Sequence, residues 1–450
     1  MPEPTRREML RAGATMMAAA AGAAVSTPRA ATAARPSTPP SRWDNEYNFG
    51  HTILFMDEYH QATMEILGSQ GGELDQIGEL TSRAASVIRA GGTAWTSMST
   101  GHMPNEEQKE TRRGSPRIMK DHRQFGPLKK GDMVFTNFCN REVRAVRDRG
   151  VYVVCVTTNY QNNEFRPVGF TDSTHDNPDG LMLKDVSNEI LHSHIPYYQG
   201  LVHAPEIPEF AVCPSTTTGS GSIHWMLNAE IANKLADPNA PAIDKSAEYL
   251  RILTERVARI SDHSDRIREV AVTMARRIRD GGRWFVSSIE HTGFQSEMSG
   301  VASGAMVVNY GDWEAAKEKN VMLITAISPA HRQEVQLARA KQIEGAYVIG
   351  IGPSSVDGDV PPGRLIDVAD AGFDNFSIES GGVIRISGQK ETICPTSGIV
   401  GNVIQQMICA QWCDEMVRRG SVPYFWMGFF QNGGHEYDAG VRPFFELQGF

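Results

Sequence analysis

Short apolar runs alternate with longer segments of helical spacing along most of the chain. The runs cover residues 95–99, 132–136 and 151–156 in the first half, and 284–289, 321–325 and 346–351 in the second. Runs of this length, nearly continuous in apolar residues, are typical of parallel strands buried on both faces. The pattern therefore predicts an α/β fold with doubly wound parallel sheets in three layers, each sheet lying between helices.

The pattern also repeats. The glycine pairs Gly91–Gly92 and Gly281–Gly282 lie 190 residues apart, and the pairs Glu58–Tyr59 and Glu248–Tyr249 keep the same offset. The helical segment before each glycine pair therefore has the same length in both halves. Such spacing predicts two tandem copies of one structural unit.

Each half later reaches a Cys-Pro pair and a turn rich in hydroxyl groups. These pairs are Cys213–Pro214 and Cys394–Pro395, and helical patterns begin near Ser222 and Val400. We place the two domains at residues 46–243 and 244–450. A chain of 450 residues is long enough to bury two such cores.

The N-terminus has the pattern of an export signal. Arg6–Arg7 precede an uncharged stretch rich in Ala and Gly at 12–25, and small residues follow at 31–33. This order is typical of a twin-arginine signal peptide, which predicts cleavage after residue 33 and a linker at 34–45. We expect an exported protein, periplasmic or extracellular, with no membrane contact beyond export. An accidental arginine pair in a basic leader is the alternative.

The net charge and the spacing of the cysteines limit which classes of partner and site the chain can have. The formal net charge of −9 argues against nucleic acid as the main partner, because phosphate binding needs clustered Lys and Arg. The six cysteines form no CxxC pair, so most are expected to be small buried residues: Cys139, Cys155, Cys213, Cys394, Cys409 and Cys413. We expect neither a cofactor nor a metal.

A histidine-rich stretch in the first half raises a metal-assisted alternative. Its members are His192, His194 and His203, with Glu206 and Glu209 nearby. Their spacing matches no helical or hairpin ligand pattern, so we favour a loop with incidental histidines.

Polar residues follow the predicted strands in both halves, at the sheet edge where ligands of such folds bind. The residues predicted to contact a ligand are Thr100, Ser215, Thr216, Thr217, Thr218, Ser288, Ser328, Thr396, Ser397 and Asn432. The turns with His102 and with Thr136–Asn137 should converge on the same edge in the first copy. The hydroxyl turn at 215–218 has another common use, as the N-cap of the following helix.

Several motifs in the second half resemble the SIS (sugar isomerase) family. They are Gly281–Gly282, His291 with Glu297, Pro395–Gly401 and Asn432–Glu436, in that order. The resemblance is greatest to a bacterial branch with a GxGH turn and a PTSxIVG helix start. It implies two SIS-like α/β units that pair as a pseudo-dimer and bind a sugar derivative. Whether the chain oligomerises further is left open.

The chain departs from the family at the turns after the second strand of each copy. Residues 136–141 and 325–331 lack the paired serines of the usual phosphate cradle. An unphosphorylated sugar or a sugar acid is therefore the expected ligand.

Aldose–ketose isomerisation needs a base and an acid, which Glu and His side chains supply. The catalytic candidates are His102, His291, Glu297, His435 and Glu436. The two strand-end histidines have a structural alternative, to brace their turns, and His435–Glu436 could lie on a solvated loop. We predict a carbohydrate-binding protein with sugar isomerase activity. The rival hypothesis is a non-catalytic carbohydrate-binding protein.

Overall fold

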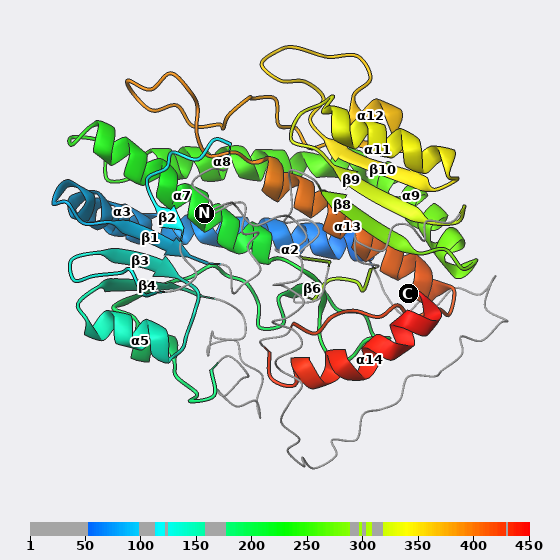
Figure 1. Cartoon of the computed structure of the whole chain (residues 1–450), viewed down its shortest axis with the longest axis horizontal. Helices are drawn as coiled ribbons and strands as arrows, with labels where there is room; N and C mark the ends of the chain where they lie inside the picture. The colour runs from blue at the N-terminus through cyan, green and yellow to red at the C-terminus, as the bar shows by residue number, and fades with distance from the viewer. Residues whose placement is uncertain are drawn as a thin grey trace, which may run out of the picture. The chain divides into compact units, whose positions relative to one another are not determined.

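Two parallel β-sheets, one in each half of the chain, form the framework of the protein (Figure 1). The computed structural model describes residues 53–98, 113–121, 125–157, 177–288, 297–298, 303–307, 318–428 and 431–450. The first sheet has the order β2-β1-β3-β4-β5, from β1 (Ala94–Ser97), β2 (Lys120–Asp121), β3 (Met133–Thr136), β4 (Tyr152–Val156) and β5 (Glu189–Leu191). The second has the order β11-β10-β9-β8, from β8 (Trp284–Ser288), β9 (Val321–Thr325), β10 (Tyr347–Gly352) and β11 (Ala371–Asp374).

The helices recur in the same order around the two sheets. In the first half they are α2 (Phe55–Gln70), η1 (Gly71–Glu73), α3 (Leu74–Arg89), α5 (Arg141–Asp148), α6 (Leu183–Val186) and α7 (Thr216–Ala236). In the second they are α8 (Lys245–Ala258), η5 (Arg259–His263), α9 (Ser264–Arg279), α11 (Arg332–Ile343), α12 (Leu365–Val368) and α13 (Ser397–Arg418). A short antiparallel hairpin, β6 (Gly200–Val202) and β7 (Val212–Pro214), precedes α7, and α14 (Gly434–Gln448) ends the chain.

Alternating strand residues place each sheet between two layers of helices. On β4, Val153 and Cys155 pack toward α5 and α6, whereas Val154 and Val156 join the large core on the opposite face. In the second half, Met322 and Ile324 pack with α11 and α12 in the same way. The predicted α/β class, with parallel sheets covered on both faces, is confirmed.

The two halves share one core through their long final helices. The α7 helix packs against α3 of its own half and α8 of the other, while α13 packs against α9 and, reciprocally, α2 (Figure 1). Both helices are buried around nearly their whole circumference. A helix that is apolar or small on every side is stable only inside a core, so each half supplies the cover of its partner.

Both long helices begin earlier than the hydrophobic pattern predicts. The α7 helix begins at Thr216 rather than near Ser222, and α13 begins at Ser397 rather than near Val400. The first turns of α7 contain Gly219 and Gly221, whose low helix propensity hides the helix in the sequence. Burial between the halves decides the conformation instead.

Two tyrosines confirm that the repeat extends to individual hydrogen bonds. The Tyr59 hydroxyl donates to the carbonyl oxygen of Pro214 at 2.8 Å, and the Tyr249 hydroxyl donates to that of Pro395 at 3.0 Å. All four groups are buried. The sequence-level match between Tyr59 and Tyr249 therefore reflects one shared structural role.

These matched bonds give a first prediction. We expect Tyr59→Phe and Tyr249→Phe each to lower the free energy of unfolding by about 1–2 kcal/mol, because each leaves a buried carbonyl without its donor. Urea denaturation of both variants measures the two losses. A loss at only one site would contradict equal roles for the two tyrosines.

The amides of Cys213 and Cys394 bond to the opposite half. The Cys213 amide donates to the Ser303 carbonyl oxygen at 2.8 Å, and the Cys394 amide donates to that of Gly114 at 2.9 Å. Both cysteines have left-handed backbone conformations, with φ of 64° and 61°. Such a conformation is uncommon outside glycine, and here the bond from the other half holds it in both turns.

The joint between the halves depends on one buried carboxylate. Glu230 of α7 is fully buried and accepts hydrogen bonds from the amides of Asp244 and Ser246, at 3.0 and 2.9 Å. The Ser246 hydroxyl donates to it as well, at 2.9 Å. Asp244, at the N-cap position of α8, makes no capping bond with its own side chain. Glu230 therefore caps the first helix of the second half.

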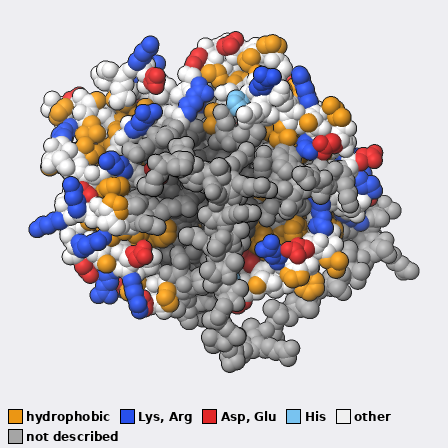
Figure 2. Space-filling model, in the orientation of Figure 1, with side chains coloured by type: hydrophobic (Ala, Val, Ile, Leu, Met, Phe, Trp, Pro, Cys, Tyr) orange, Lys and Arg blue, Asp and Glu red, His pale blue; other side chains and the backbone are white. Residues whose placement is uncertain are grey.

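The outer surface is mixed in charge. On the face shown in Figure 2, Lys and Arg side chains are interspersed with Asp and Glu over the described elements. A nucleic-acid surface would gather positive side chains instead. Within the described ranges, no helix has the length and apolar character needed to cross a membrane.

Candidate functional site

The start of α7 brings together predicted site residues from both halves. Ser215 occupies the N-cap position, but its hydroxyl does not cap the helix. Its amide and its hydroxyl both donate to the Gln199 carbonyl oxygen, each at 2.9 Å. The expected N-cap use of Ser215 is therefore absent, and the first N–H groups of α7 are left for another acceptor.

That acceptor is Glu297, from the segment that follows β8 in the second half. Its Oε1 accepts from the Thr217 amide at 3.0 Å and from the Thr217 hydroxyl. Its Oε2 accepts from Nε2 of Gln406, on α13, at 3.1 Å. The predicted catalytic carboxyl and the predicted hydroxyl turn are thus in direct contact, across the boundary between the halves.

Burial changes the acidity of this carboxyl group. Glu297 is fully buried, and desolvation raises its pKa from the usual 4.5 to about 7, against the lowering effect of the hydrogen bonds from Thr217, Asn402 and Gln406. Burial holds the pKa of the Tyr59 hydroxyl well above the usual value, and the charge of Glu297 raises it further. A carboxyl with a pKa near neutrality can both accept and return a proton.

Three neighbouring side chains have unused hydrogen-bonding capacity. The hydroxyls of Thr216 and Thr218 and both amide atoms of Gln199 have no hydrogen-bond partner, although all three residues are completely buried. An unpartnered buried polar group costs about 1–3 kcal/mol, so such groups point to a bound water or ligand. Gln199 was not predicted, since a single Gln in the sequence carries no motif.

The equivalent helix start in the second half has a different chemistry. Nη1 of Arg256 donates to the Thr396 hydroxyl at 2.5 Å, and the same guanidinium is paired with both oxygens of Glu379, at 2.6 and 2.8 Å. The Ser377 hydroxyl lies 3.4 Å from that of Thr396. Ser397, the first residue of α13, is buried beside this pair. Neither Arg256 nor Glu379 was predicted from the sequence.

Two further predicted ligand contacts lie at the carboxyl ends of the second sheet. The hydroxyl of Ser288, at the end of β8, is buried and unpartnered, and so is that of Thr325 opposite it at the end of β9. Ser328, beyond β9, accepts a hydrogen bond at 3.3 Å from Arg113 of the first half. Both halves thus contribute residues to this edge of the second sheet, as they do to the start of α7.

The C-terminal candidates lie in more exposed surroundings. His435 and Glu436 are exposed in the first turn of α14, and Asn432 is half-buried in the loop before it. The same loop does contact the first half, because Gln431 donates to the carbonyl oxygen of Tyr197 at 3.3 Å. Of the other candidates, Thr100, His102 and His291 lie outside the described residues, and their roles stay predictions.

The histidine-rich stretch is distributed over separate pairs. Nε2 of His194 lies 3.0 Å from Glu73, and Nδ1 of His203 lies 3.1 Å from Glu58. Across the described ranges, no three His, Cys, Asp or Glu side chains form a group suited to a metal ion. These contacts give no support to the metal-assisted alternative.

All six cysteines are buried, as expected, and none is part of a disulfide. Trp412 is likewise fully buried and packs edge-on against Trp284, which identifies it as a core residue. Burial raises the pKa of the Cys155 thiol to about 12, so this thiol is unreactive at neutral pH.

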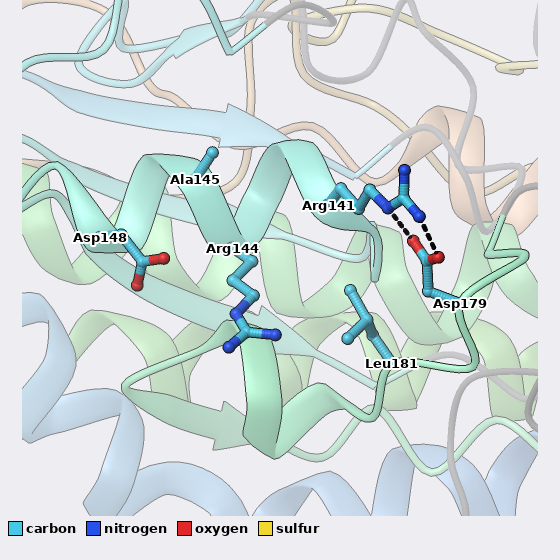
Figure 3. A pocket seen from close by; sticks show the side chains of 6 residues that line it. All are labelled: Arg141, Arg144, Ala145, Asp148, Asp179 and Leu181. Atoms are coloured by element: carbon cyan, nitrogen blue, oxygen red, sulfur yellow. Dashed lines mark hydrogen bonds and ion pairs between the residues drawn. The ribbon is translucent and has the colours of Figure 1, made fainter.

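A surface cavity of about 390 Å³ lies on the outer side of α5, away from the helix starts described above. Figure 3 shows its lining, with Arg141 turned toward Asp179 as an ion pair and Arg144 on the same side of the helix. Its charges are exposed and partly neutralise one another. The polar residues at the α7 start are a better candidate site, because they are buried and have unused hydrogen-bonding capacity.

No family model and no curated protein matches the sequence. Among solved structures, the chain is similar to the C-terminal domain of glucosamine-fructose-6-phosphate aminotransferase from Francisella tularensis, with TM-score 0.43 and 11% identity over 85% of this chain and 99% of that chain. It is also similar to tagatose-6-phosphate ketose/aldose isomerase from Escherichia coli, with TM-score 0.41 and 12% identity over 83% and 95% of the two chains. A function must therefore be argued from the chain's own residues.

Proposed function

We propose that this protein binds a carbohydrate derivative at the start of α7 and interconverts its aldose and ketose forms, working outside the cytoplasm. The observation that carries the proposal is the contact of Glu297 with Thr217. It places a buried carboxyl at the same helix start as Thr216 and Thr218, whose hydroxyl groups have unused hydrogen-bonding capacity. The SIS-like motifs of the second half agree with this proposal, and the leader sequence motivates the location.

The chemistry requires one group that moves a proton between adjacent carbons. In the proposed reaction, Glu297 takes the proton from the carbon beside the carbonyl group and returns it to the former carbonyl carbon, while the hydroxyl proton of the first carbon passes to the carbonyl oxygen. Its pKa of about 7 suits both steps, since neither protonation state is strongly disfavoured at neutral pH. Thr216, Thr218 and Gln199 would orient the sugar hydroxyls through their unused donors and acceptors.

Proton transfer to carbon can be followed directly. Incubation of the protein in D₂O with a panel of neutral sugars, sugar acids and phosphosugars should place deuterium on a carbon next to the carbonyl group of the substrate, detected by NMR. We expect Glu297→Gln to slow this exchange about 100-fold, because the amide cannot accept the proton. Exchange at the original rate in Glu297→Gln would rule out Glu297 as the base.

One observation favours a second candidate function, binding without catalysis. Glu297 already accepts two bonds from Thr217 and one from Gln406, as a purely structural helix cap would. Tight binding of a panel sugar with no deuterium exchange would establish this candidate instead.

A further inference from the structure

The start of α7 is occupied by a carboxyl group that belongs to the protein itself. The first N–H groups of a helix attract negative charge, because they have no partners within the helix. In many proteins a ligand's phosphate or carboxylate occupies this position. Here the Thr217 amide and hydroxyl are both directed to Oε1 of Glu297, which the opposite half supplies.

We propose that Glu297 makes this site select an uncharged carbohydrate and exclude ligands that carry a phosphate or carboxylate at the helix start. The inference rests on the proposed function and specifies its substrate class. An anionic group would have to displace the Glu297 carboxylate from Thr217 or stand beside it. Two like charges in buried surroundings repel each other strongly, since little water is present to screen them.

The side chains around the helix start support this selectivity. The unpartnered groups of Thr216, Thr218 and Gln199 are neutral, and they offer donors and acceptors together. The hydroxyl groups of a sugar also donate and accept, so they can satisfy both kinds. A phosphate dianion only accepts, and it would leave the acceptor oxygens of this cluster without partners.

The start of α13 provides an internal comparison. There the N-cap hydroxyl of Thr396 accepts from Arg256, a cation held by Glu379. Among the described residues, a carboxyl group accepts from the first turn of α7, whereas an arginine–glutamate ion pair lies at the start of α13.

Sulfate is a suitable probe, because it stays doubly charged from about pH 5 to pH 8 and resembles phosphate in shape. Calorimetric titration at about pH 8 should show no sulfate binding to the wild-type protein. Glu297→Ala should bind sulfate with an affinity at least tenfold higher than that of the wild-type protein. Glu255→Ala, which removes an exposed carboxylate elsewhere, should behave as the wild type does. If Glu297→Ala does not fold, Glu297→Gln can replace it, because it keeps the side-chain volume. Its affinity for sulfate should be at least threefold higher than that of the wild type.

Equal sulfate binding by the wild type and the Glu297 variants would overturn the inference. Deuterium exchange on a phosphosugar by the wild-type protein would also overturn it, since only neutral members of the panel should exchange. The sulfate titration needs no substrate. If sulfate binds only to the Glu297 variants but no sugar is exchanged, the isomerase activity is refuted, while the exclusion of anions from the α7 start is retained.

Discussion

Glu297→Gln should remove a fall in stability that the wild-type protein shows between about pH 4.5 and pH 7. The pKa of Glu297 is raised by burial from 4.5 to about 7. Between these two values the folded protein keeps a proton that the unfolded chain has lost, so raising the pH favours unfolding. The full difference corresponds to about 3 kcal/mol, gained below pH 4.5 and lost as the pH rises through 7.

Urea denaturation across this pH range measures the effect. Asp438 must be controlled, because burial raises its pKa from 3.8 to about 7 and it acts in the same direction over the same range. We therefore expect Glu297→Gln and Asp438→Asn each to remove part of the slope, and the double variant to remove most of it. An unchanged slope in Glu297→Gln would show that this carboxyl titrates normally.

We expect Glu230→Ala to lower the free energy of unfolding by about 3–5 kcal/mol, more than the effect expected for Glu297. It leaves the amides of Asp244 and Ser246 and the Ser246 hydroxyl buried without an acceptor, at the point where the second half begins. Glu230→Gln retains one acceptor oxygen and should lose about half as much. Urea denaturation of both variants provides the measurement.

Asp244→Ala is the matched control for this cap. Asp244 stands at the N-cap position, where removing a capping side chain usually costs about 1 kcal/mol. Because Asp244 makes no capping bond of its own, we expect its loss to be within about 0.5 kcal/mol. A larger loss for Asp244→Ala than for Glu230→Gln would mean that the cap is assigned to the wrong carboxylate.

The fold could be predicted in outline because its signals lie in short stretches of the sequence. Residues such as Tyr59 and Tyr249, or the two glycine pairs, keep the same offset, and the strands are short apolar runs of recognisable length. The order of the strands and the sharing of α7 and α13 between halves could not be predicted. The strand order depends on which strands pair, as Ala94 does with Met133, and the packing of α13 against α2 joins residues more than 300 positions apart.

The sequence suggests the members of the candidate site but not their pairing. It points to the turn at Ser215–Thr218 and to the carboxyl of Glu297, because hydroxyl groups at a helix start and acids near a strand end are typical of binding sites. Nothing in the sequence joins them, since they belong to different halves. Gln199 and Gln406 were missed because a neutral amide shows its role only through its neighbours.

The exchange of carbonyl partners at Cys213 and Cys394 also limits how the two copies can evolve. After most gene duplications, one copy is free to diverge while the other preserves the ancestral role. Here a change in the backbone near Ser303 alters the helix-start turn of the first copy, and a change near Gly114 alters that of the second. Each copy therefore depends on the geometry of its sibling for the shape of its own helix-start turn.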